Sequence, residues 1–230
     1  MAPKQRKIYD NVCNDIVKEL KGVSINNERY ISTIQYLLQV ADTAESIQKL
    51  GKNKAEEFSG KIASLKDTFT DEISEDKKVV LFSFYANKVL PIIRRELEKI
   101  NISTLMITGK TKNKQKIVDT FNNTNKYQVL LCSDSMSRGS NLQSAHYIMN
   151  FDLPWNPAVL DQRIARLYRR GLKHNIMIIN FITHDSIESL VLNKIYDKRQ
   201  MFDDFMGGKM QPVDLMDEIP VSDFIKFARC

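Results

Sequence analysis

The first 70 residues carry apolar side chains at helical spacing. One apolar stripe comprises Ile8, Val12, Ile16 and Leu20, and a second comprises Ile34, Leu37, Leu38 and Ala41. Positions three or four residues apart lie on one face of a helix. The pattern therefore predicts an all-helical segment, with helices over residues 4–21, 27–40, 42–50 and 60–70, before the charged stretch 71–78.

From residue 79 the pattern changes to short apolar runs separated by amphipathic segments. The runs predict strands over residues 79–84, 102–108, 129–132, 146–151 and 176–182. The segments between them predict helices over 86–100, kinked at Pro91, and over 112–122 and 157–168, with one more long helix over 186–206. Apolar strands alternating with helices indicate a parallel sheet covered on both faces. We therefore expect a doubly wound α/β core, followed by a tail over 207–230 that is loosely ordered or packed on the core.

Composition excludes several classes of protein. With 230 residues, 43% of them hydrophobic and 27% charged, the chain is neither wholly disordered nor fibrous. Its apolar runs are much shorter than a membrane span of about 18 residues, and residues 1–12 lack the apolar region of a signal peptide. We expect a soluble, intracellular protein with no membrane partner.

Cysteine and histidine usage gives no sign of disulfides or a structural metal. Cys13, Cys132 and Cys230 are too few and too scattered for a disulfide framework, and the three histidines show no metal-ligand spacing. A net charge of +6 usually reflects basic residues spread over a solvated surface. If the basic residues cluster, the charge favours an anionic partner.

Two polar segments directly follow predicted strands. Gly109-Lys110-Thr111 is not a P-loop, because Thr104 stands where that motif needs its first glycine. We interpret it as a loop at the carboxyl edge of the sheet, where open α/β sheets bind ligands. Residues 133–142 leave the same edge, and their small side chains let the backbone approach a phosphate or another domain closely, although a flexible polar loop is the alternative.

A basic segment follows in the predicted helix over 157–168. The inward face is expected to hold Ile164, Leu167 and Tyr168. Arg166, Arg169 and Arg170 are spaced to share another face, where their like charges repel one another. Such a cluster suits a polyanion or a triphosphate, because a guanidinium binds phosphate oxygens with two donors. A solvated basic face is the alternative.

These segments, in this order, resemble those of a known family. Residues 133–141, Ser-Asp-x-x-x-Arg-Gly-x-Asn, resemble motif V of superfamily-two helicases, and residues 162–169, Gln-Arg-Ile-Ala-Arg-Leu-Tyr-Arg, resemble motif VI. Between them, Asn-Phe-Asp-Leu-Pro-Trp-Asn-Pro at 150–157 is similar to the segment typical of Swi/Snf-type DNA translocases, with a bacterial RapA/HepA-like branch nearest. Residues 80–83 resemble motif IV, residues 107–122 the segment after it, and Ser-Gly-Lys at 59–61 the residues before the second motor lobe.

The resemblance implies a division of the chain and a function. Residues 77–184 would form a RecA-like helicase C-terminal lobe, residues 1–76 a helical extension or linker from a first lobe, and residues 185–230 a brace helix and tail. The whole protein would be a DNA-dependent ATPase that translocates on double-stranded DNA and remodels protein–DNA complexes. The P-loop and the acidic box that holds Mg²⁺ for ATP belong to the first lobe, so we expect this chain alone to be inactive.

The resemblance also implies roles for individual residues. Arg169 would be the arginine finger, with Arg166 its partner on the γ-phosphate. The ATP-binding residues would be Gly139, Asn141 and Gln162. The DNA-binding residues would be Ser83, Gly109, Lys110, Ser133 and Arg138. No metal ligand is expected in this chain.

The implied partners are double-stranded DNA, the first lobe of the same protein and a DNA-bound protein complex. The site of action would be the cytoplasm or nucleoid in a prokaryote or virus and the nucleus in a eukaryote. One alternative is an RNA helicase lobe, against which residues 152–157 and Gln162 argue. Another is a stand-alone docking module for nucleic acid or protein, which would not need Arg166 and Arg169. Trp155 fits a core anchor better than a base-stacking residue.

Overall fold

The computed structural model describes residues 1–20, 27–47, 55–136, 140–154, 156–168, 172 and 174–206. Contacts divide the chain into two compact units. The helical unit comprises Met1–Lys61, Trp155–Ala158 and Ile182–Cys230, and the sheet unit comprises Ile62–Pro154 and Val159–Phe181. The predicted ranges 1–76, 77–184 and 185–230 were drawn by motif and stay a prediction.

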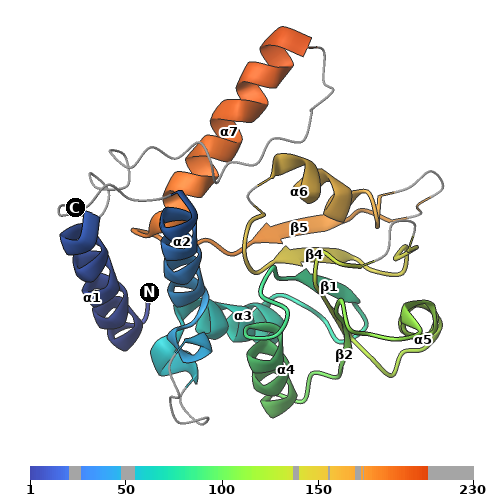
Figure 1. Ribbon diagram of the computed structural model, residues 1–230. Coiled ribbons are helices and arrows are strands. Elements are labelled where there is room, and N and C mark those ends of the chain that lie inside the picture. Colours follow the sequence, from blue (N-terminus) through green and yellow to red (C-terminus); the bar gives the residue numbers. More distant parts are fainter. Residues whose placement is uncertain are drawn as a thin grey trace. The chain divides into compact units, whose positions relative to one another are not determined.

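Five parallel strands form the centre of the sheet unit (Figure 1). They are β1 (Val79–Phe82), β2 (Thr104–Ile107), β3 (Val129–Cys132), β4 (Tyr147–Asn150) and β5 (Met177–Asn180), in the order β2-β3-β1-β4-β5. The flanking helices are α3 (Gly60–Asp71), α4 (Leu90–Lys99), α5 (Lys114–Asn123) and α6 (Pro157–Ile164). Parallel strands need such crossover connections. The predicted RecA-like doubly wound fold is confirmed.

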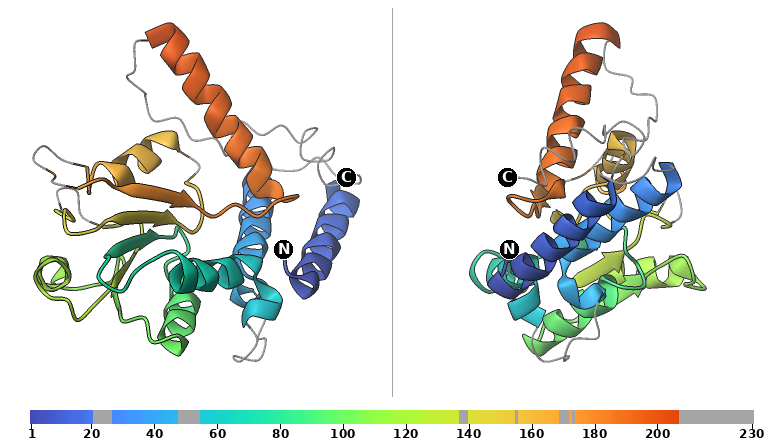
Figure 2. Two further views of the ribbon diagram at one scale, coloured as in Figure 1. Left: turned by 180° about the vertical axis from the view of Figure 1, so that it is seen from behind. Right: turned by 60° about the vertical axis from the view of Figure 1, so that its left-hand side comes forward.

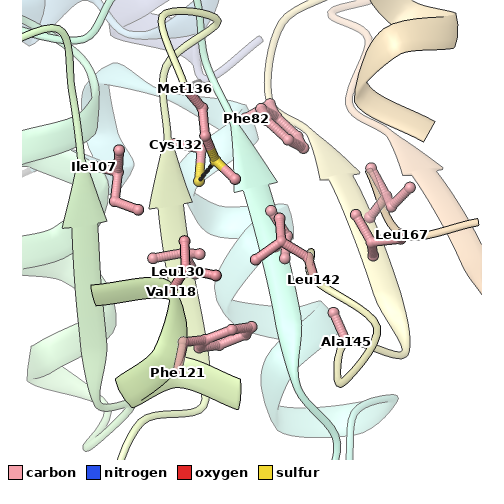
Figure 3. Close-up of a cluster of buried hydrophobic side chains, with 12 residues drawn as sticks. Phe82, Ile107, Val118, Phe121, Leu130, Cys132, Met136, Leu142, Ala145 and Leu167 are labelled. Atoms are coloured by element: carbon pink, nitrogen blue, oxygen red, sulfur yellow. Dashed lines mark hydrogen bonds between the residues drawn. The ribbon is translucent and has the colours of Figure 1, made fainter. Parts of the chain in front are cut away.

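Alternate strand residues supply the core on one face of the sheet. Val80, Phe82, Leu130, Cys132 and Ile148 are fully buried in one cluster. Val118 and Phe121 of α5 pack against it, and Figure 3 shows both beside Leu130 of β3. Each fully buried large apolar side chain contributes about 1.5–3 kcal/mol. This packing fixes α5 on the sheet and the start of α5 near the carboxyl ends of β2 and β3.

Two helices begin or end differently from the prediction. Pro91 does not kink a longer helix but lies in the first turn of α4, where its missing N–H costs nothing. α6 ends at Ile164, because the next residues form a tight turn in which Leu167 N–H donates to Ile164 O (3.1 Å). That turn buries Leu167 completely but leaves Tyr168 72% exposed, so the inward position predicted for Tyr168 was wrong.

Two other segments also differ from the apolar pattern. β5 was predicted as a buried strand, yet Met177 and Ile178 are exposed, because β5 is an edge strand of the sheet. The helix predicted over 42–50 is reduced to a short 3₁₀ turn, η1 (Ala44–Ser46), in the part that the structure describes.

The helical unit is built from α1 (Pro3–Leu20), α2 (Asn27–Asp42), η2 (Ala55–Phe58) and α7 (Ile187–Met206). α2 packs against both α1 and α7 (Figure 2). The predicted stripe of α2 from Ile34 to Ala41 is buried as expected. No helix among the described residues is long and apolar enough to cross a membrane.

The buried face of α1 lies next to the face that the apolar stripe from Ile8 to Leu20 predicts. Tyr9, Cys13 and Val17 are buried, whereas Ile8 is only half-buried. The reason is polar: the Gln5 amide donates to the carbonyls of Val40 (2.7 Å) and Ala41 (2.8 Å), and the Tyr9 hydroxyl accepts from Ile187 N–H (2.7 Å). These bonds turn α1 so that the line of Gln5 and Tyr9 faces inward.

Two histidines stack where β4 and β5 begin. The rings of His146 and His174 lie 4.4 Å apart at 25°, and His174 Nε2 is 3.0 Å from the carbonyl of Ala145. Burial, the neighbouring His174 and the positive charge of Lys77 lower the pKa of His146 from its usual 6.5, against a small opposing effect of Asp76.

We predict that acidification below about pH 6.5 destabilises the chain, because His146 takes up a proton more readily when unfolded than when folded. The stabilising contribution is complete above that pH and is lost as the pH falls through the folded pKa. Chemical denaturation at about pH 7.5 and about pH 5.5 measures the loss. His146→Gln should reduce it, whereas His184→Gln, at an exposed histidine, should not. An unchanged pH dependence in His146→Gln would contradict the assignment.

Candidate functional site

The carboxyl ends of the strands align at one edge of the sheet. Phe82 at the end of β1 pairs with Cys132 of β3 and with Asn150 of β4, and Cys132 pairs with Ile107 of β2. The segments that follow these strands therefore leave from the same edge. They are the segments that resemble helicase motifs, and this edge is where open α/β sheets bind ligands.

Arg163 of α6 joins that helix to the loop after β3. Its side chain is 1% exposed. Nε donates to Asp134 Oδ1 (2.7 Å), and Nη2 donates to Asp134 Oδ2 (2.9 Å). Two parallel bonds between guanidinium and carboxylate are among the strongest and most directional in proteins. They hold residues 133–135 against α6.

The same guanidinium also binds the end of β4. Nη1 donates to Asn150 Oδ1 (2.9 Å) and to the carbonyl of Asp152 (3.0 Å), and Nη2 lies 3.7 Å from Asp152 Oδ1. The guanidinium carbon is 5.2 Å from the centre of the Phe82 ring. Arg163 thus connects α6 with the ends of three neighbouring strands.

Asp152 extends this network to the loop after β1. Its carboxylate accepts hydrogen bonds from the Ser83 hydroxyl and from Phe84 N–H (2.8 Å), and Ser83 Oγ accepts from Tyr85 N–H (3.2 Å). Ser83 is fully buried. Its hydroxyl therefore orders the loop after β1, and its predicted contact with DNA stays a prediction.

Sequence reasoning did not assign a role to Arg163. A usable signal was present, because Leu160, Arg163, Ile164 and Leu167 follow the spacing of an apolar helix face. A charge on such a face needs a buried partner of opposite charge. In the structure this partner is Asp134.

Besides Ser83, the described residues among the predicted DNA contacts lie in the loops after β2 and β3. Gly109 and Lys110 are exposed, whereas Ser133 is buried with its hydroxyl 2.6 Å from that of Ser135. A Cβ atom on Gly109 would lie 3.5 Å from Ser135 Oγ, so the loops after β2 and β3 are in contact. Arg138 lies outside the described residues.

The predicted nucleotide-binding residues are only partly described. Asn141 and Gln162 are exposed, while Gly139 and the arginine-finger candidate Arg169 lie outside the described residues. The backbone carbonyl of Arg166 accepts a hydrogen bond from Leu142 N–H (3.3 Å). The segments that resemble motifs V and VI therefore touch next to Asn141. Arg170 and Trp155 also fall outside the described residues.

Arg166 does not lie on a helix as predicted. α6 ends two residues earlier, so the expected helical face shared with Arg169 and Arg170 does not hold for Arg166, which is 8% exposed. Burial raises the pKa of the Cys132 thiol, and the positive charges of Arg166 and Arg163 oppose this only in part. Cys132 is therefore an uncharged residue of the core.

The Ser-Gly-Lys segment belongs to a separate buried cluster in the helical unit. Lys61 Nζ donates to Asp42 Oδ1 (2.8 Å) and to Glu188, and all three side chains are almost completely buried. Burial alone would lower the pKa of Lys61, but attraction to the two carboxylates outweighs it and raises the pKa. Glu188 also accepts from Thr183 N–H (2.8 Å). The cluster ties α2, the start of α3 and the start of α7 together.

Within the described residues, no group of three or more His, Cys, Asp or Glu side chains could hold a metal ion. At the carboxyl edge the carboxylates of Asp134 and Asp152 are engaged by Arg163 and by the loop after β1, while Lys110 is exposed and suits an anionic ligand.

We predict that Arg163→Lys lowers the free energy of unfolding by about 2 kcal/mol, because lysine cannot form the fork with Asp134 and leaves buried acceptors unpaired. Arg94→Lys is the control. Arg94 forms an exposed ion pair with Glu98. Arg94→Lys should therefore lower the free energy of unfolding by less than about 0.5 kcal/mol. Denaturant unfolding of both variants measures the difference. Equal losses would show that the hydrogen bonds of Arg163 contribute no more to stability than an exposed ion pair.

Comparison with known proteins shows which domain and which relatives this chain is similar to. Residues 60–171 match the model of the helicase conserved C-terminal domain. The chain is 32% identical over 151 residues to the uncharacterised ATP-dependent helicase YqhH of Bacillus subtilis, a match that covers 65% of this chain and 26% of that relative. The chain spans about a quarter or less of the curated relatives that it matches.

Solved structures show the same fold. The Sulfolobus solfataricus SWI2/SNF2 ATPase C-terminal domain is similar with a TM-score of 0.76 and 20% identity, over 99% of this chain and 93% of that one. The Sulfolobus solfataricus SWI2/SNF2 ATPase core in complex with dsDNA is similar with a TM-score of 0.76 and 23% identity, over 90% of this chain and 44% of that one. Residues 60–171 therefore match a helicase conserved C-terminal domain, and the predicted resemblance of the chain to the C-terminal lobe of Swi2/Snf2-type ATPases is confirmed.

Proposed function

We propose that this chain is the second motor lobe of an ATP-dependent translocase on double-stranded DNA that remodels protein–DNA complexes inside the cell. The observation that carries the proposal is the network around Arg163. It holds the segment resembling motif V, through Asp134, against the segment resembling motif VI, in α6. A similar fold is that of a SWI2/SNF2 ATPase core in complex with dsDNA, which supports DNA as the partner.

In the proposed motor, ATP lies between two lobes. The first lobe holds the phosphates and Mg²⁺. This chain supplies Arg169 as the arginine finger and Arg166 as its partner on the γ-phosphate, with Gly139, Asn141 and Gln162 as further ATP contacts. Arginine fingers raise turnover by a factor of about 10³–10⁵, because they stabilise charge on the transferred phosphoryl group.

The segment that carries the proposed catalytic arginines begins at a helix that is held firmly on the sheet. Arg163 anchors the last turn of α6 to the sheet edge, and Arg166 follows within the turn that buries Leu167. Catalysis by positioned charge requires rigid support, because an error of about 1 Å in position can cost about a hundredfold in rate. The proposed role of Arg163 is this support.

DNA would lie along the carboxyl edge of the sheet. Gly109 and Lys110 are exposed there, Ser133 belongs to the neighbouring loop after β3, and Arg138 is proposed as a further contact from its motif. Contacts to phosphates carry no sequence information, which suits a motor that must pass over any sequence. Closure of the two lobes on ATP and their opening after hydrolysis would move the protein along the duplex.

We predict that Arg169→Ala, made in a protein that contains both lobes, lowers DNA-stimulated ATP turnover by at least about a thousandfold. The affinities for ATP and DNA should change much less, because other groups hold both ligands. Arg169→Lys should restore little activity, since lysine lacks the planar fork of arginine. Steady-state ATPase assays and equilibrium binding measure both effects.

Arg170→Ala is the control for that experiment. It removes the same charge from the adjacent position, where the motif does not require arginine. Equal losses of turnover from Arg169→Ala and Arg170→Ala would show an effect of bulk positive charge, and the role proposed for Arg169 would be wrong.

A further inference from the structure

The side chain of Asn122, at the end of α5, binds the short turn over residues 141–144 that precedes β4. Its Nδ2 donates to the backbone carbonyl of Asn141 (2.7 Å), and its Oδ1 accepts a hydrogen bond from the Ser144 hydroxyl (2.7 Å). Asparagine carries this donor and this acceptor on one planar group. Asn122 therefore holds the turn at two points, next to the end of the segment that resembles motif V.

The end of α5 gives Asn122 a fixed position. Phe121 is fully buried in the core cluster on the sheet. The ammonium of Lys78, a residue that is only 8% exposed, donates to the backbone carbonyls of Phe121 and of Asn122 (3.1 Å). A lysine stabilises this end of a helix, because the last carbonyls have no partner within the helix. The Asn122 amide thus ties the turn over 141–144 to an anchored helix end.

The same turn also binds the segment that resembles motif VI. Leu142 N–H donates to the backbone carbonyl of Arg166 (3.3 Å). The Leu142 side chain is fully buried in one core cluster with Leu167, as Figure 3 shows. Ala145 N–H donates to the carbonyl of Leu142 (3.0 Å). The turn over 141–144 therefore lies between Asn122 and Arg166 and contacts both.

The hydrogen bonds to Asn122 and to Arg166 meet on a single peptide group. The carbonyl of Asn141 and the N–H of Leu142 belong to the peptide bond that joins these two residues, and a peptide group is planar and rigid. A shift of the Asn141 carbonyl therefore also moves the donor that binds the Arg166 carbonyl. Hydrogen bonds in such a series polarise one another, so that each strengthens the next.

We propose that Asn122 is a positioning residue for Arg166. The inference rests on the proposed function, in which Arg166 acts on the γ-phosphate, and it adds a residue outside the segments that resemble motifs V and VI. Asn122 holds the peptide group between Asn141 and Leu142, and through it the backbone from which the Arg166 guanidinium extends. An arginine that stabilises charge in the transition state must be placed accurately, so its displacement lowers turnover more than the affinity for ATP.

The test uses a protein that contains both lobes and measures kcat for DNA-stimulated ATP hydrolysis separately from KM for ATP. Asn122→Asp keeps the size of the side chain and an acceptor for Ser144, but it replaces the donor to Asn141 by an oxygen. Asn123→Asp is the matched control, because it makes the same change of charge at the next residue of α5, which is exposed.

We expect Asn122→Asp to lower kcat by about tenfold to a hundredfold, since an error of about 1 Å in the position of a catalytic group can cost about a hundredfold. KM for ATP should change by less than about twofold, because the lost interaction matters only in the transition state. Asn123→Asp should leave both kcat and KM unchanged.

A double-mutant cycle with Arg166→Ala shows whether Asn122 acts through Arg166. If it does, Asn122→Asp lowers kcat in the wild-type background but causes no further loss beside Arg166→Ala, because no guanidinium remains to be positioned. Ser144→Ala removes the other hydrogen bond of the Asn122 amide and should lower kcat by a smaller factor. It keeps the test valid if denaturant unfolding shows that Asn122→Asp folds poorly.

Three results would overturn the inference. If Arg166→Ala lowers kcat but Asn122→Asp and Ser144→Ala do not, Asn122 positions nothing, while the proposed function stands. If Asn122→Asp lowers kcat by the same factor with and without Arg166, or only raises KM, it does not act through Arg166. If Arg166→Ala itself leaves kcat unchanged, the role proposed for Arg166 is wrong, and the inference fails with it.

Discussion

Burying a guanidinium away from water is costly unless its N–H groups find acceptors in a fixed geometry. Arg163 meets this constraint with acceptors from two segments: the carboxylate of Asp134 after β3, and Asn150 and the carbonyl of Asp152 at the end of β4. Asp152 in turn binds the loop after β1 through Ser83. The ends of three strands and one helix thus share a single charged centre.

The rest of the candidate site depends on this centre. A parallel sheet brings its strand ends to one edge, but it does not fix the loops that leave them. The Arg163 network fixes three of these connections, and the Lys114–Ser135 hydrogen bond fixes a fourth. Phosphate recognition needs such preformed surfaces, because each mobile loop would have to be ordered when the ligand binds.

The fold was predictable because its strands are continuous apolar runs. Residues 129–132 read as a buried strand, and all four are buried in β3. Buried polar contacts were harder to predict. Gln5 and Tyr9 turn α1 toward backbone groups that lie far away in sequence, and an apolar stripe gives no sign of such partners. The end of α6 at Ile164 also depends on a distant residue, since Leu142 N–H donates a hydrogen bond to the carbonyl of Arg166.

The sequence motifs predicted which segments meet at the candidate site, but they predicted the roles of individual residues less well. The segments after β1, β2 and β3 meet at the sheet edge as expected, and those resembling motifs V and VI touch. Ser83 was expected at a surface but is buried, because a small hydroxyl can serve either a ligand or a neighbouring carboxylate. The importance of Arg163 depends on its pairing with Asp134, and pairing across 29 residues cannot be derived from local spacing.

A double-mutant cycle between Arg163 and Asp134 tests the central claim most directly. The free energy of unfolding is measured for the wild type, Arg163→Lys, Asp134→Asn and the double variant. If the fork holds the sheet edge together, the two substitutions are coupled by at least about 1.5 kcal/mol, because the second adds little once the first has broken the fork. Additivity within about 0.5 kcal/mol would contradict the account, because the two side chains would then contribute independently.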